Sequence, residues 1–171
     1  MDRELPLAEI LARAKREGIR LADIPYWEVA FRGAEPRLPQ KVRGLAQPPY
    51  EYYVVDFRVG NRPTGRLILD ARTGDVDEIT GSDHADEPIP EFLTPYQAAR
   101  VLRNRDLTTA DGRKLRLDPA GVEIDEEMVW KPCDQSRTPF QAFYVAHQAG
   151  ETFYIRADGA IFGELTEFEV V

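Results

Sequence analysis

Two stretches of sequence decide the fold: Tyr52-Tyr53-Val54-Val55-Asp56-Phe57 and, after a polar break, Leu67-Ile68-Leu69-Asp70-Ala71-Arg72-Thr73-Gly74-Asp75-Val76. Aromatic and branched apolar residues dominate both runs, and a Gly turn ends the second run. This pattern predicts an antiparallel hairpin. Both rows of alternating side chains in the first run are largely apolar, which is typical of a sheet covered on both faces.

The second half of the chain repeats this pattern. Phe143-Tyr144-Val145-Ala146-His147 and Phe153-Tyr154-Ile155-Arg156-Ala157-Asp158-Gly159-Ala160-Ile161 again predict two strands and a Gly turn. An amphipathic segment that begins with a proline, Pro6 or Pro95, precedes each hairpin. The spacing of helix, hairpin and turn is similar in the two halves, which indicates a duplicated unit.

We therefore expect an α+β protein of two tandem units, residues 1–88 and 89–171, each a helix on a curled antiparallel sheet. In the first unit the patterns predict a helix over 6–17, which Gly18 ends, and a strand over 24–31. An irregular Pro-rich segment follows over 34–49. Further strands are predicted over 51–59, 66–71 and 76–79. The segment 34–49 has a second interpretation, an excursion between strands that packs on the surface.

The second helix has the clearer start. Thr94 is an N-cap, Pro95 occupies the first helical position, and Gln97 completes a capping box. The patterns also predict strands, in this second unit, over 115–117, 122–130, 140–148, 151–157 and 160–165.

Composition restricts the classes of partner. The chain has 171 residues and a net charge of −8, which argues against nucleic-acid binding. Its basic clusters, over 32–43 and 100–116, are interpreted as solvated faces. Cys133 is the only cysteine, so no internal disulfide can form. No apolar run reaches the ~20 residues of a membrane helix, and no secretion signal is visible, so we expect a cytoplasmic protein without a membrane partner.

A helix followed by a hairpin whose strand ends in Asp-x-x-Thr-Gly-x-Val, here Asp70-Ala71-Arg72-Thr73-Gly74-Asp75-Val76, is similar to the PepSY-like domain. The second copy, 154–161, resembles a shortened variant with Asp-Gly in place of Thr-Gly. The resemblance implies a cystatin-like arrangement and a role in binding or inhibiting peptidases. It carries no catalytic residues, and its members are usually secreted or membrane-attached.

Three residue patterns could form a catalytic or metal site, and each has a plainer structural interpretation. Cys133 could act as a nucleophile with His84 or His147 and with Asp134 as orienting group, but a loop cysteine and a strand histidine explain the pattern. Two acidic runs could bind a hard cation, but acidic turns also explain them. The first run holds Asp70, Asp75, Asp77 and Glu78, and the second holds Asp83, His84, Asp86 and Glu87. A catalytic pair of carboxylates, as in a hydrolase, could come from the acidic residues Glu123, Asp125, Glu126 and Glu127. The solvent-facing side of a half-buried strand also explains these residues.

The sequence therefore favours a non-enzymatic protein-binding or inhibitor module of bacterial type, without a cofactor, since no phosphate-binding loop is present. Its expected partner is a protein; a homodimer is also compatible with the sequence. The predicted interface combines the irregular segments 37–49 and 131–139, with these residues: Arg37, Lys41, Arg43, Tyr50, Lys131, Gln135 and Arg137. Two alternatives stay open: a small-molecule-binding or hydrolytic domain that uses a cavity between sheet and helix, and a toxin-neutralising immunity protein.

Overall fold

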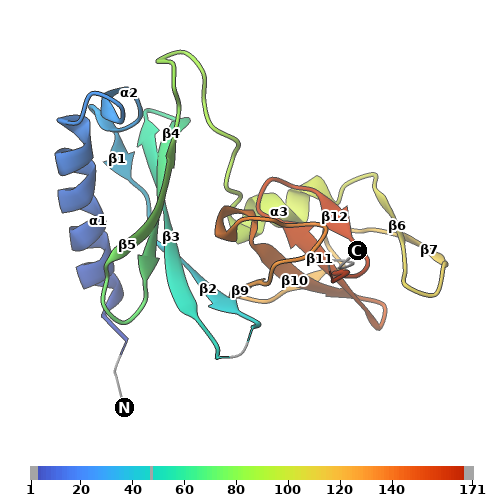
Figure 1. The fold of residues 1–171 in the computed structure, drawn as a ribbon. Helices are drawn as coiled ribbons and strands as arrows, with labels where there is room; N and C mark the ends of the chain where they lie inside the picture. The colour runs from blue at the N-terminus through green and yellow to red at the C-terminus, as the bar shows by residue number, and fades with distance from the viewer. Residues whose placement is uncertain (1–3, 47, 168–171) are drawn as a thin grey trace. The chain divides into compact units, whose positions relative to one another are not determined.

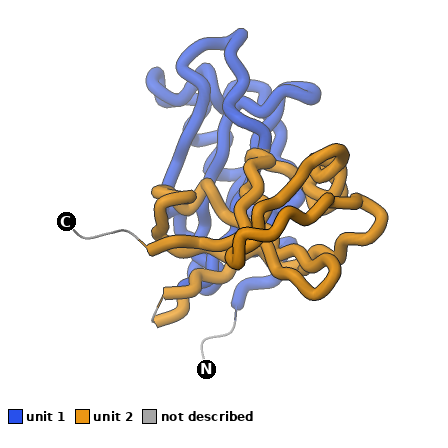
Figure 2. The backbone as a smooth tube through the Cα atoms, turned by 90° about the vertical axis from the view of Figure 1, so that its right-hand side faces the viewer, with its two compact units in different colours: residues 1–42, 50–91 blue, residues 43–49, 92–171 orange. Residues whose placement is uncertain are grey.

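The computed structural model describes residues 4–46 and 48–167. It is an α+β protein (Figure 1), as the sequence predicts. The chain divides into two compact units (Figure 2): unit 1 holds residues 1–42 and 50–91, and unit 2 holds residues 43–49 and 92–171. The duplication of one ancestral unit stays a prediction.

The first helix, α1, spans Leu7–Ala22. Its buried positions recur at helical spacing and face the core of unit 1; they are Ile10, Ala14, Gly18 and Leu21. The expectation that Gly18 ends the helix is wrong. A Cβ atom at Gly18 would lie 2.4 Å from Cε1 of Phe57, so the missing side chain lets the helix approach the sheet closely and continue.

Residues 24–31 do not form the predicted strand. A turn leads into α2, a short helix over Glu28–Phe31. The Trp27 and Phe31 rings contact edge to face with centroids 6.3 Å apart, and Phe31 meets Phe57 in the same way at 5.0 Å. An aromatic pair four residues apart suits a helical turn, and its packing overrides the strand propensity of the segment.

The segment 34–49 is also more regular than predicted, because it holds two strands. These are β1, Glu35–Pro36, and β2, Gln40–Gly44. β1 pairs antiparallel with the end of β3, placing Glu35 opposite Arg58. β2 spans the division between the units, since residues 43–49 belong to unit 2.

The central hairpin of unit 1 is confirmed. It consists of β3, Glu51–Val59, and β4, Arg62–Asp70, and β5, Val76–Gly81, pairs with the far side of β4. The predicted six-residue connection is only the two-residue turn Gly60-Asn61, with Gly60 in the left-handed region at φ 61°. One face of the hairpin and α1 form the core, which includes Tyr53, Val55, Phe57, Leu67 and Leu69.

The helix of unit 2 is α3, Pro95–Val101, whose predicted capping box is confirmed. The backbone N–H of Gln97 donates to Oγ1 of Thr94 at 3.3 Å, and the N–H of Thr94 donates to Oε1 of Gln97 at 2.9 Å. Local sequence therefore determines where this helix starts.

The strands of unit 2 are short. They are β6 Asp106–Thr108, β7 Lys114–Arg116, β8 Glu123–Ile124, β9 Met128–Trp130, β10 Phe143–Gln148, β11 Glu151–Arg156 and β12 Ile161–Phe162, with a 3₁₀ turn over Pro139–Gln141. The predicted strand over 122–130 is wrong as one element. β8 and β9 pair with different parts of β10, and the acidic residues between them, which disfavour strand, form the break. The strands predicted over 140–148 and 160–165 are correspondingly shorter: a proline-started turn occupies 139–141, and β12 ends before Gly163.

Candidate binding groove

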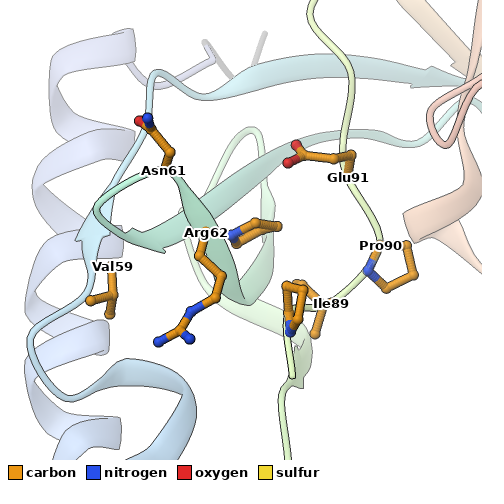
Figure 3. Close-up of a pocket in the computed structure, with 8 residues that line it drawn as sticks. Val59, Asn61, Arg62, Ile89, Pro90 and Glu91 are labelled. Atoms are coloured by element: carbon orange, nitrogen blue, oxygen red, sulfur yellow. The ribbon is translucent and has the colours of Figure 1, made fainter. Parts of the chain in front are cut away.

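A groove of about 860 Å³ lies at one end of the central hairpin of unit 1 (Figure 3). Two segments line it. The hairpin tip contributes Val59, Asn61, Arg62 and Pro63, and a segment that we call the strap, residues 88–91, contributes Pro88, Ile89, Pro90 and Glu91. Five of these eight side chains are apolar, so the walls favour an apolar occupant.

The hairpin tip follows from the Gly60-Asn61 turn. The turn pairs Val59 with Arg62 across the two strands and leaves Val59 38% exposed. Pro63 has no N–H to donate, and the register of β4 with β5 begins only at Gly65, so a proline is tolerated there. The tip therefore presents an apolar surface with one arginine.

Two hydrogen bonds, one between backbone groups and one from a side chain to the backbone, hold the strap against β4. The N–H of Ile89 donates to the carbonyl of Pro63 at 3.0 Å, and Nη2 of Arg66 donates to the carbonyl of Pro90 at 2.8 Å. Pro88 and Pro90 restrict the backbone further, because each ring fixes its own φ. The groove is thus formed before any partner arrives.

A charge network beneath the groove completes this attachment. Oδ1 of Asp56 accepts from Nε and Nη2 of Arg66 at 2.9 and 2.7 Å, and Oδ2 accepts from Nε of Arg58 at 2.9 Å. Arg58 also pairs with Glu91 of the strap. The Arg66 side chain is only 5% exposed, so removing Asp56 would take from a buried charge the carboxylate that contributes most to offsetting its burial.

Burial and pairing act in opposite directions on the two guanidinium groups. Burial lowers the pKa of Arg66, and the adjacent Asp56 offsets only part of this effect. Burial also lowers the pKa of Arg58, but hydrogen bonds and charge from Glu91 and Asp56 outweigh it and raise that pKa above its ordinary value. Both groups stay charged at neutral pH, since arginine loses its proton only far above it.

One cation of the groove has a weak partner. Nη1 of Arg62 lies 3.8 Å from Oδ1 of Asp86, a fully exposed carboxylate, and the Arg62 side chain is 40% exposed. The close-up shows its guanidinium between Val59 and Ile89 (Figure 3). Such an exposed pair contributes little, so Arg62 can pair with a carboxylate of a partner.

The predicted interface residues of unit 1 have partners within the unit. Nζ of Lys41 lies 2.8 Å from Glu4, and Tyr50 donates its hydroxyl to Asp77 and stacks on Tyr52. Burial, followed by the charge and hydrogen bond of Asp77, raises the pKa of the Tyr50 hydroxyl. Arg37 is different: its Nη2 reaches the carbonyl of Gly60, 3.3 Å away, in the hairpin turn next to the groove.

The remaining predicted residues belong to unit 2, so the segment 37–49 is divided between the units. Nε of Arg43 lies 3.3 Å from Glu127, and Nζ of Lys131 lies 3.9 Å from Glu167. The Gln135 side chain bonds Thr166, and the Arg137 N–H donates to Gln141. Within unit 2 the N–H of Leu45 donates to the carbonyl of Trp130, which attaches the segment 43–49 to β9. These contacts give each of the four residues a partner within the fold, and their role in an interface stays a prediction.

The three kinds of chemical site have other local explanations. Cys133 is fully buried beside Val129 and Phe143. Nδ1 of His147 lies 3.1 Å from the Thr152 hydroxyl and Nε2 lies 3.3 Å from Asp125. Among residues 4–46 and 48–167, no three His, Cys, Asp or Glu side chains gather where they could hold a metal ion. The break between β8 and β9 removes the continuous strand face that the carboxylate pair required.

Comparison with protein-family models, with curated proteins and with solved structures found no match for this chain. In the part of the chain that the structure describes, none of the helices has the length and apolar character needed to cross a bilayer.

The sequence patterns do not predict the groove. The expected units divide the chain between residues 88 and 89, inside the strap, and the hairpin strands are expected to be joined only by a polar break. The available signal was Pro88-Ile89-Pro90, in which an apolar side chain stands between two prolines. A solvated linker has no need of that isoleucine.

Proposed function

We propose that this chain is a non-enzymatic protein-binding module, which docks an apolar segment of its partner in the groove of unit 1. The observation that carries this proposal is the preformed apolar wall made by the hairpin tip and the strap. A rigid groove loses little entropy on binding, so more of its contact energy contributes to affinity.

The satisfied interior supports a binding role over a hydrolytic one. Among the described residues, every buried side-chain nitrogen or oxygen has a hydrogen-bond partner. A hydrolytic site usually retains polar groups that converge on an open space and await a substrate. The groove instead offers mostly apolar surface, and Arg62 is the one cationic residue among its eight lining residues.

The charge of the groove restricts the partner segment. Glu91 is already paired with Arg58, whereas within the described residues Arg62 pairs only with the exposed Asp86. A segment with apolar side chains beside a carboxylate would complement both features. The PepSY-like resemblance adds a class of target, and we extend the proposal to inhibition of a peptidase that presents such a segment.

Selection from a displayed peptide library tests the proposal. We expect the protein to select peptides with two or more apolar residues next to Asp or Glu. Val59→Asp and Ile89→Asp place a charge on each wall and should abolish binding of the selected peptides, whereas Lys131→Gln, in the other predicted interface, should leave it unchanged. If the selected peptides bound Val59→Asp and Ile89→Asp as tightly as the parent, the groove would not be the binding site. If Lys131→Gln lost binding instead, the predicted interface formed by segments 37–49 and 131–139 would be favoured.

A further inference from the structure

The walls of the groove are accessible from solvent, so their chemistry restricts what can fill it (Figure 3). Val59 on the hairpin tip is 38% exposed, and Ile89 on the strap is partly exposed. The two prolines of the strap, Pro88 and Pro90, are exposed as well. Arg62 adds a cation whose side chain is 40% exposed. A segment that fits this surface combines several apolar side chains with a neighbouring carboxylate.

The chain itself contains a segment of this composition. After Glu167 the sequence continues with Phe168-Glu169-Val170-Val171, which lies outside the described residues. Phenylalanine and valine supply the apolar side chains, and Glu169 stands between two of them. These four residues therefore meet the requirement that the groove places on its partner, namely apolar residues next to an acidic one.

The same segment follows a point that is held in place. The N–H of Asp134 donates to the carbonyl of Thr166 at 3.1 Å, and the N–H of Thr166 donates to Oε1 of Gln135 at 3.0 Å. Four extended residues span at most about 14 Å, and filling the groove uses most of that length. Docking within one chain would therefore require Thr166 to adjoin the groove, whereas docking on a second copy has no such requirement.

We propose that the segment 168–171 of one copy docks in the groove of unit 1 of a second copy. This inference rests on the proposed function and names an occupant for the same groove. The apolar side chains of the segment lie against the hairpin tip and the strap, and Glu169 pairs with Arg62. Each copy has one groove and one segment, so two copies can exchange segments and form a symmetric dimer. The docked segment also competes with any other partner for the groove.

Sedimentation of the full chain over a range of concentrations tests the exchange. The parent should self-associate. Val59→Asp charges the groove and Phe168→Ser shortens the apolar part of the segment, so each should weaken self-association at least about tenfold. A mixture of these two variants should form a complex of one copy of each, because one retains the segment and the other retains the groove. Ile19→Asp is the matched control and should self-associate like the parent, because Ile19 is 62% exposed on α1 and does not line the groove.

A peptide measurement isolates the contact. The probe is Glu-Leu-Thr-Glu-Phe-Glu-Val-Val, residues 164–171 with acetyl and amide ends, followed by fluorescence anisotropy. The receptor is the full chain with Phe168→Ser, whose own segment competes weakly. Adding Ile89→Asp to this receptor should weaken binding at least about tenfold. Arg62→Gln should weaken it about two- to fivefold, the effect of a partly exposed ion pair, and should not weaken further a peptide that carries Glu169→Gln.

Several results would overturn the proposal. A parent chain that stays monomeric at every concentration is one, and unchanged self-association in Val59→Asp or Phe168→Ser is another. Equal binding of the 164–171 peptide with and without Ile89→Asp would place the contact elsewhere. If peptides selected from the displayed library bind the groove and the 164–171 peptide does not, this inference fails while the proposed function stands. If neither kind of peptide binds, both fail.

Discussion

The helices of the two units differ in what determines them. α3 has a complete capping box and ends after 7 residues, whereas α1 has no side-chain cap and continues for 16 residues. Four positions of α1 are buried at helical spacing, but within α3 only Ala98 is. A cap therefore determines where a helix begins, and the length of the helix follows from the surface on which it packs.

The two units also differ in how deeply they bury an arginine–aspartate pair. In unit 1, Asp56 and Arg66 are buried and hold the strap, whereas in unit 2 Arg156 donates to both carboxylate oxygens of Asp158 at the turn after β11. Arg156 is 21% and Asp158 is 36% exposed, so water screens this second pair. Similar chemistry should therefore have unequal effects in the two units.

Breaking the two ion pairs gives the largest expected difference. Asp56→Ala should destabilise unit 1 by about 3–5 kcal/mol, because the buried Arg66 would lose the carboxylate that contributes most to offsetting its burial. Asp158→Ala should cost less than about 1 kcal/mol in unit 2. Urea unfolding followed by tryptophan fluorescence separates the units, since Trp27 lies in one and Trp130 in the other. Equal losses in the two variants would remove the contrast.

The contact of Gly18 with Phe57 gives the next effect. Gly18→Ala should destabilise unit 1 by about 1–3 kcal/mol, because overpacking exceeds the gain in helix propensity of about 1 kcal/mol. Combining it with Phe57→Leu, which shortens the ring, should recover part of the loss in a double-mutant cycle. A stabilising Gly18→Ala would show that helix propensity, and not packing, dominates at this position.

Removing the cap of α3 tests the other side of the comparison. Thr94→Ala should destabilise unit 2 by about 1 kcal/mol, since it leaves the N–H of Gln97 without its acceptor. Pro6→Ala at the corresponding position of α1 should cost clearly less, because no side chain caps that helix. Circular dichroism and urea unfolding measure both. A larger loss of stability from Pro6→Ala than from Thr94→Ala would show that the start of α1, and not that of α3, depends on its N-cap residue.

The pH dependence of two carboxyl groups is the smallest expected effect, and its sign differs between the units. Burial and the neighbouring Asp77 raise the pKa of Glu78, so the folded state is penalised once pH rises above the ordinary glutamate range. Burial raises the pKa of Asp158, but the hydrogen bond and charge of Arg156, together with backbone hydrogen bonds, outweigh burial and lower that pKa below its ordinary value. The ionised Asp158 therefore stabilises the folded state at neutral pH, and this stabilisation is lost as pH falls through the lowered pKa.

Glu78→Gln should therefore stabilise the protein slightly at pH 7 and have no effect near pH 3. Asp158→Asn should destabilise it at pH 7 and converge with the parent at the acid end. Both changes should stay within a few tenths of a kcal/mol, because water screens both groups. Thermal unfolding of both variants and the parent across pH 3–7 measures these differences in stability. If the difference from the parent changed with pH in the same direction for both variants, the opposite pKa shifts of Glu78 and Asp158 would be contradicted.

Local sequence signals predicted the parts of the fold that depend on neighbours in the chain. The capping box at Thr94 and the central hairpin belong to this class. Gly18 was misread because a helix stop and a close helix–sheet contact both require glycine, and only the position of Phe57 distinguishes them. The groove was out of reach for the same reason, since Ile89 and Pro63 meet only through the folded chain.

The claim that the groove is formed before binding has one direct measurement, the hydrogen exchange of the Ile89 amide in the free protein. Its hydrogen bond to Pro63 predicts exchange at least about a hundredfold slower than in an unstructured peptide. The same amide should lose protection in Asp56→Ala, which releases the strap, while the core amide of Leu67 indicates whether the sheet persists. Exchange of Ile89 at the unstructured rate in the parent protein, with Leu67 protected, would contradict a preformed groove.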